Sequence, residues 1–122
     1  SVAILSHAKG ALWRSDKNGG YIGFGTATGA MWRSDGNGGF YGVGAGINGQ
    51  MWRSDGAGGF NGFGPGIEGQ LIRPDGHGGY NGLGPGLEGF IWRSDGNGGF
   101  NLFSQGTVKL WRSDNDGGFN GY

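Results

Sequence analysis

The sequence contains no cysteine, only three prolines and no long hydrophobic run. Without cysteine, disulfides and thiolate chemistry are excluded, and the redox compartment cannot be read from the composition. A membrane-spanning helix requires about 20 consecutive apolar residues. No segment of the chain approaches that length, so we expect no membrane insertion. Nine Lys and Arg are balanced by nine Asp and Glu, so there is no basic excess of the kind that binds nucleic acid.

Glycine is the residue that the sequence has in excess. It supplies 34 of the 122 residues, whereas average proteins contain about 7%. Glycine inside a helix costs about 1 kcal/mol relative to alanine, so the composition disfavours a helical fold. Collagen is also excluded, because glycine does not recur at every third position. The hydrophobic core must therefore be formed largely by the five Trp, eight Phe and four Tyr side chains.

One motif recurs along the whole chain: Trp-Arg-Ser-Asp, two variable residues, Gly-Gly and an aromatic residue. The copies are 19 or 20 residues apart and begin at Trp13, Trp32, Trp52, Ile72, Trp92 and Trp111. The fourth copy departs from the motif at Ile72 and Pro74. Six units therefore form one domain, with boundaries near 11–30, 31–50, 51–70, 71–90, 91–109 and 110–122, the last completed by 1–10.

Each unit has room for two short strands and two turns. In the third unit we expect strands at 50–54 and 60–64, joined by a turn at 55–59 that is rich in Asp and Gly. Asp and Gly tolerate the positive φ angles that tight turns need. Short strands with a turn signal every 8–12 residues are typical of sandwiches, barrels and related folds.

We therefore predict an all-β fold in which six tandem β-hairpin repeats close into a pseudo-symmetric barrel or prism-like structure. Completion of the sixth unit by the start of the chain favours closure over the open alternative, a β-solenoid. A trefoil-like barrel and a small propeller also fit twelve strands. The interior of a round twelve-stranded barrel is hard to fill with glycine, which favours a prism of three sheets or a flattened barrel.

The first strand of each unit leaves open which of its faces is buried. Side chains alternate between faces, so Trp shares one face with Ser, and Arg shares the other with the residue before Trp. Trp can therefore form the core or line a surface groove. Arg and Asp persist in the fourth unit, where Trp is lost, which indicates a scaffold role. An Arg can brace the Asp of its own or a neighbouring turn by charge-assisted hydrogen bonds.

The same residues predict a shallow carbohydrate site in each unit. An aromatic ring can stack on the apolar face of a sugar, while Asp, Asn and Arg bond its hydroxyls. Several weak sites on one molecule bind a surface strongly. The predicted ligand-binding residues are Trp13, Arg14, Asp16, Trp32, Arg33, Asp35, Asn37, Trp52, Arg53, Asp55, Asn61, Arg73, Asp75, Asn81, Trp92, Arg93, Asp95, Asn97, Asn101, Trp111, Arg112, Asp114 and Asn120. The unit of Ile72, which lacks the ring, is expected to bind weakly.

Metal and catalytic sites are not supported by the sequence. The Asp-Gly-Asn-Gly-Gly stretches lack the alternating oxygen ligands and closing Glu of a calcium loop. The two glutamates, Glu68 and Glu88, occupy equivalent turn positions, and no nucleophile elbow or phosphate-binding loop occurs. We therefore expect neither enzymatic activity, nor a bound metal, nor a cofactor.

In its small size, its Gly and Trp content and its internal symmetry the chain resembles tandem-repeat lectins, and no residue role is taken from that resemblance. We predict a multivalent, metal-independent lectin, an agglutinin with glycans or polysaccharide as partners. The alternative is a non-enzymatic structural or surface-binding repeat protein, for polysaccharide, ice or matrix, with Trp in the core. The first ten residues lack the pattern of a signal peptide, which fits a cytoplasmic protein or a secreted one already processed. Homo-oligomerisation stays open.

Overall fold

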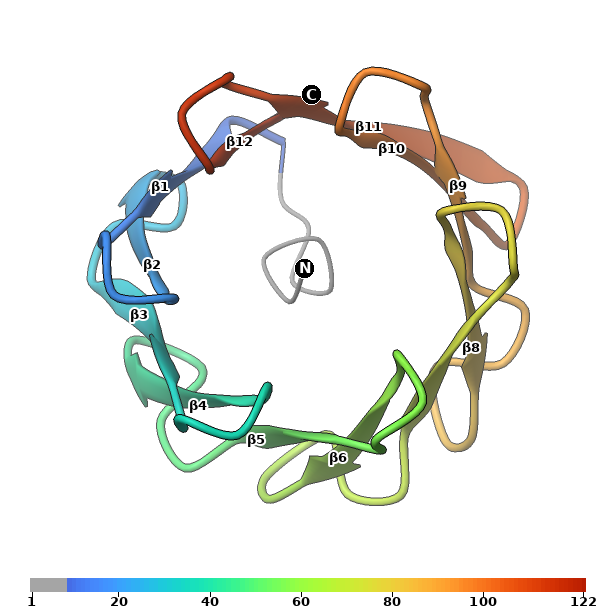
Figure 1. The fold of residues 1–122 in the computed structure, drawn as a ribbon, viewed down its shortest axis with the longest axis horizontal. Coiled ribbons are helices and arrows are strands. Elements are labelled where there is room, and N and C mark those ends of the chain that lie inside the picture. Colours follow the sequence, from blue (N-terminus) through green and yellow to red (C-terminus); the bar gives the residue numbers. More distant parts are fainter. Residues whose placement is uncertain (1–8) are drawn as a thin grey trace.

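The computed structural model describes residues 9–122, which form strands and turns. The strands are β1 (Ala11–Ser15), β2 (Tyr21–Gly25), β3 (Ala30–Ser34), β4 (Phe40–Gly44), β5 (Met51–Ser54), β6 (Phe60–Phe63), β7 (Leu71–Pro74), β8 (Tyr80–Leu83), β9 (Ile91–Ser94), β10 (Phe100–Ser104), β11 (Thr107–Ser113) and β12 (Phe119–Gly121). Each pairs antiparallel with its neighbours in sequence, and β12 pairs with β1, so one sheet closes into a barrel (Figure 1). Among residues 9–122, no helix is long and apolar enough to span a membrane.

This barrel confirms the predicted all-β fold of repeated hairpins. Because a single sheet contains all twelve strands, the prism of three sheets and the solenoid are not the closure adopted. The sheet closes where Leu12 lies opposite Asn120 and Trp13 opposite Phe119. The predicted completion of the sixth unit by residues 1–10 falls mostly on residues 1–8, which lie outside the described residues.

The Trp side chains point into the barrel and fill it. All five are 0–2% exposed. A glycine of the adjacent strand lies opposite several of them, as Gly62 does opposite Trp52. A Cβ on Gly62 would lie 3.0 Å from the Trp52 ring, so glycine at this position makes room for the indole. The glycine content was expected to disfavour a twelve-stranded barrel. The buried Trp rings supply the volume inside the barrel that glycine lacks.

A second inward layer consists of the aromatic residue that follows Gly-Gly in each unit. Its members are Tyr21, Phe40, Phe60, Tyr80, Phe100 and Phe119. Five pairs of these rings are in contact, with centroids 5.9–6.3 Å apart. Each ring also lies beside the Trp or Ile of the following unit in the sheet, as Phe40 lies beside Trp52. The core therefore joins each unit to the next.

The fourth unit shows how the core tolerates the loss of one Trp. Ile72 takes its place and is 1% exposed. Phe90 stands where the preceding loops have Gln50 and Gln70, and it packs against the core. A Cβ on Gly82, which lies opposite Ile72, would be 3.2 Å from Phe90 Cβ. The unit with the smaller Ile72 therefore has a larger loop side chain next to Gly82.

The two glycines of each hairpin turn have different roles. The first has a positive φ, for example 84° at Gly98, which disfavours other residues. The second lies against the next unit: a Cβ on Gly99 would contact the carbonyl oxygen of Trp111 and come within 2.7 Å of Asp95 Oδ2. All six of these turns lie at one end of the barrel, here called the turn rim, because each joins the two strands of one hairpin.

Substitution of Gly99 by Ala is therefore expected to lower the free energy of unfolding by about 1–3 kcal/mol, the usual cost of overpacking. The matched control is Gly96→Asn. Gly96 has φ 80° and open space at Cβ, and Asn115 already occupies the equivalent position with φ 62°. Urea denaturation should leave this control within about 0.5 kcal/mol of the wild type. Equal effects of the two substitutions would contradict the close approach at Gly99.

Candidate functional site

The Asp of each turn folds that turn through its own backbone. Asp95 Oδ1 accepts N–H bonds from Asn97 at 2.7 Å and from Gly99 at 2.9 Å. The Asp95 N–H in turn donates to the Gly99 carbonyl at 3.0 Å. Ser94 Oγ accepts the Gly96 N–H at 3.1 Å. The Ser-Asp-x-x-Gly-Gly sequence thus specifies a compact turn with little help from the rest of the fold.

The second oxygen of each Asp faces an Arg of the next unit around the barrel, and the last unit pairs with the first. The six ion pairs, 3.0–3.5 Å long, are Arg33–Asp16, Arg53–Asp35, Arg73–Asp55, Arg93–Asp75, Arg112–Asp95 and Arg14–Asp114. The Arg side chains are 35–50% exposed, and exposed pairs of this kind contribute about 0–1 kcal/mol each. The pairs confirm that Arg braces the turn of a neighbouring unit, and their regularity fixes the position of each turn relative to the next.

The pKa of each of these six Asp carboxyls is lowered from its ordinary value of 3.8. At Asp55 the backbone N–H donors of Ala57 and Gly59 are the main cause, and the Arg73 charge adds to them. At Asp95 partial burial raises the pKa, but the backbone donors and the Arg112 charge outweigh it. The carboxylates therefore stay ionised and act as acceptors near neutral pH.

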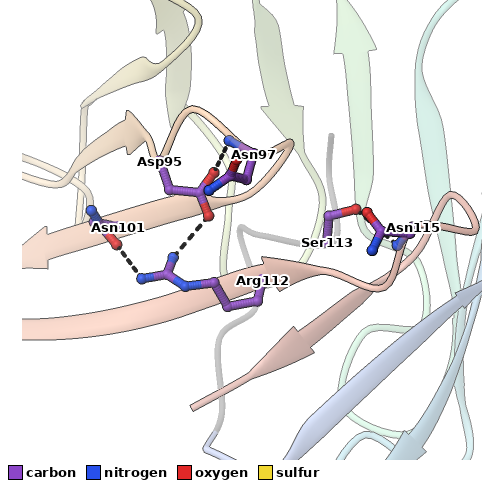
Figure 2. Close-up of a pocket in the computed structure, with 6 residues that line it drawn as sticks. All are labelled: Asp95, Asn97, Asn101, Arg112, Ser113 and Asn115. Carbon is purple, nitrogen blue, oxygen red and sulfur yellow. Dashed lines mark hydrogen bonds and ion pairs between the residues drawn. The ribbon is translucent and has the colours of Figure 1, made fainter.

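A groove at the turn rim lies between the β9–β10 turn and the β11–β12 turn. Its cavity of about 310 Å³ is lined by Asp95, Asn97, Asn101, Arg112, Ser113 and Asn115, and we call it the 95–115 groove (Figure 2). Arg112 Nη1 lies 3.1 Å from Asp95 Oδ2, and Arg112 Nη2 donates to Asn101 Oδ1 at 2.9 Å. Two residues of the neighbouring hairpin thus hold the guanidinium in place: Asp95, which follows β9, and Asn101, which lies in β10.

Two carboxamides of the 95–115 groove remain available to a ligand. Asn97 and Asn115 use their backbone N–H groups in the turns, and both residues are exposed. Among the described residues, no hydrogen bond involves their side-chain amides. An amide offers both donors and an acceptor. The groove therefore presents neutral donors and acceptors beside a fixed Asp–Arg pair.

The corresponding positions between the other units carry different residues. Where the 95–115 groove has Asn101, the first two units have Ile22 and Tyr41. There the Arg of the next unit turns to a Met of its own strand: Arg33 Nη2 lies 3.2 Å from Met31 Sδ. At the seam between the sixth unit and the first, an ion pair of 3.0 Å joins Lys17 to Asp116. The six inter-unit positions are therefore chemically unequal.

The structure separates the predicted ligand-binding residues into two groups. The five Trp lie in the core, so no ring face is open to a sugar. This corrects the expected stacking role, and the reason for a weak site at Ile72 no longer applies. The predicted Arg and Asp residues lie at the turn rim, where they bind one another.

The predicted Asn residues have three different surroundings. Asn61, Asn81 and Asn101 accept bonds from the Arg of the next unit at 2.8–3.2 Å. Asn120 Oδ1 is buried without a hydrogen-bond partner, and Asn37 is exposed on its turn, as Asn97 is. Sequence reasoning missed Ser113 and Asn115. Asn115 could have been noticed, because it replaces the glycine found at this turn position in units two to five.

Within residues 9–122, no group of three or more His, Cys, Asp or Glu side chains is placed to hold a metal ion. The candidate site is therefore the 95–115 groove, and the Asp–Arg pairs of the other units lie on the same turn rim. No protein-family model, no curated protein and no solved structure matches the chain, so the site stands on its own geometry.

Proposed function

We propose that the protein binds carbohydrate without a metal and without chemical turnover, through the polar grooves of the turn rim. The supporting observation is the 95–115 groove, whose six lining residues are all polar or charged. Its volume of about 310 Å³ is at the lower end of the range of about 300–1,000 Å³ that small-molecule sites occupy. Asp, Arg, Asn and Ser together match the mixed donor and acceptor character of sugar hydroxyls. In this proposal the sugar is held by hydrogen bonds and not by stacking on Trp.

Repetition of the grooves supports a multivalent mode of binding. Six inter-unit positions, each with an Asp–Arg pair, follow one another around a single rim, so a glycan-coated surface can meet several of them at once. Each further contact then forms at a high effective concentration, which raises the total affinity without new chemistry. Because the grooves are unequal, we expect the 95–115 groove to contribute most to binding of a single sugar.

The experiment is a glycan array with labelled protein, with and without EDTA, followed by titration calorimetry with the selected monosaccharide. The double variant Asn97→Ala/Asn115→Gly removes both free carboxamides and copies residues that other units already have, Ala57 and Gly56. Loss of the two hydrogen-bonding groups should weaken binding at least about tenfold. EDTA should have no effect.

Asn37→Ala is the matched control, because it makes the same change as Asn97→Ala between units where Tyr41 and Gly56 stand in place of Asn101 and Asn115. It should keep the monosaccharide affinity within about twofold of the wild type. Unchanged affinity in the double variant would remove the 95–115 groove from the proposal. A blank array would contradict the lectin function itself.

A second candidate is a surface-binding repeat protein, and one observation favours it. The outer face of the barrel carries an apolar row with one member in most units, including Phe24, Phe63, Leu83 and Phe103, which are 39–47% exposed. A regular row of this kind suits an extended polysaccharide surface. Retention on insoluble polysaccharide together with a blank array of soluble glycans would support this candidate over the first.

A further inference from the structure

The end of the barrel opposite the turn rim is asymmetric. There the loops between hairpins bury one apolar residue each: Ile47, Ile67 and Leu87. In the first loop the equivalent residue is Ala27. The equivalence follows from the backbone, since Ala27 O accepts the Ala30 N–H at 3.1 Å just as Ile47 O accepts the Gln50 N–H at 3.0 Å. The first loop thus has a small side chain where the others have a large one.

A cavity of about 170 Å³ lies at this asymmetric position. It is lined by Ala11, Trp13, Thr26, Ala27, Thr28, Ala30, Ala45 and Ile47, and we call it the alanine pocket. Four of its residues are alanine, and neighbouring units have Gln50 and Pro65 where the pocket has Ala30 and Ala45. The substitutions that replace larger repeat residues by alanine therefore cluster around the alanine pocket. In another protein, an apolar cavity of about 150 Å³ binds benzene.

Trp13 lines the alanine pocket, and its indole nitrogen, like that of Trp32, is buried without a partner. Trp13 is 2% exposed, and its Nε1 is buried without a hydrogen-bond acceptor. An indole nitrogen can only donate, and leaving a buried donor unsatisfied costs about 1–3 kcal/mol. An acceptor atom that enters the pocket would remove this cost. Thr26, Thr28 and Ala45 are exposed, which provides an entrance.

We propose that the alanine pocket binds one small, largely apolar molecule, about the size of a six-membered ring, that carries a single hydrogen-bond acceptor such as a carbonyl oxygen. The ring occupies the space that Ile or Leu fills in the other loops. The acceptor takes the hydrogen bond of Trp13 Nε1–H. This site lies at the other end of the barrel from the 95–115 groove and is independent of carbohydrate binding.

The test uses cyclohexanone as the probe and cyclohexane as the equivalent molecule without an acceptor. The readout is the Trp13 indole N–H resonance in an NMR titration of the full chain, assigned by its loss in Trp13→Phe. Cyclohexanone should move this resonance downfield in a saturable manner, because a hydrogen bond forms. Cyclohexane should not produce the downfield shift.

Ala27→Ile fills the pocket with the residue that the second and third loops already have, and it should weaken cyclohexanone binding at least about tenfold, equivalent to about 1.4 kcal/mol. The matched control, Ile67→Leu, changes the same loop position outside the pocket and should not alter binding. Thermal unfolding checks that both variants fold. The proposal is overturned by the absence of a saturable shift, by a shift that persists in folded Ala27→Ile, or by equal shifts with both probes.

Discussion

Replacing Trp92 by Ala is expected to lower the free energy of unfolding by about 3–5 kcal/mol, the usual cost of truncating a buried aromatic side chain. Trp92 is 0% exposed. It lies beside Tyr80 in the sheet, and its ring centroid is 6.0 Å from that of Phe90. Truncation therefore leaves a cavity between two units. Domains have a total stability of about 5–15 kcal/mol, so one such change removes a large share of it.

The same variant separates a core role of Trp from a sugar-stacking role. Urea denaturation gives the loss of stability, and titration calorimetry at a temperature where the variant is folded gives the sugar affinity. We expect a large change in the first and an unchanged affinity in the second. Trp92→Ile is the matched control, since Ile72 is the natural replacement, and it should cost less than Ala because it retains more buried volume. Weaker sugar binding with unchanged stability would contradict the burial of Trp92.

Acid is expected to unfold the protein steeply, because the six turn Asp residues act together. Their folded-state pKa values lie below the ordinary value of 3.8. As the pH falls through that value, the unfolded chain binds protons that the folded chain does not, so the free energy of unfolding decreases. The stabilisation is fully present above the unfolded-state pKa and is lost as the pH falls through the folded-state values.

The measurement is the free energy of unfolding in urea from about pH 6 to about pH 2, whose slope gives the number of protons taken up on unfolding. That number should be positive below about pH 5, and the six turn Asp residues can contribute at most one proton each. Asp55→Asn is the matched variant, because an amide oxygen can still accept the N–H bonds of Ala57 and Gly59. It should reduce the proton uptake, by at most one proton. A slope that does not change in Asp55→Asn would contradict the role of the turn carboxylates.

Local features of the molecule could be derived from the sequence because their causes are local. The hairpin turns follow from Asp and Gly at fixed positions, since a carboxylate bonds N–H groups two and four residues later and glycine accepts positive φ. The same Asp and Gly positions recur in all six units. The persistence of Arg73 and Asp75 in the unit that lost Trp likewise indicated the bracing of one turn by the next.

The surroundings of the site residues depended on contacts between units. The predicted Asp, Arg and Asn residues do line the turn rim, but the sequence does not show that each Arg is held by the preceding unit. The free carboxamides of Asn97 and Asn115 became recognisable only once two turns were placed side by side. The position of Phe90 is of the same kind, because Phe90 and Ile72 are distant in the motif and both neighbour Gly82 in space.

The sequence by itself determined the all-β class, the six hairpins and the chemistry of the turns. Tertiary structure decided which face of the strands is buried, because alternation with a period of two distinguishes two faces without saying which is inside. It also decided that one sheet closes on itself, since closure depends on strand tilt and stagger along the whole chain. Once Trp and the second aromatic layer fill that interior, the polar grooves remain at the turn rim and the alanine pocket at the opposite end.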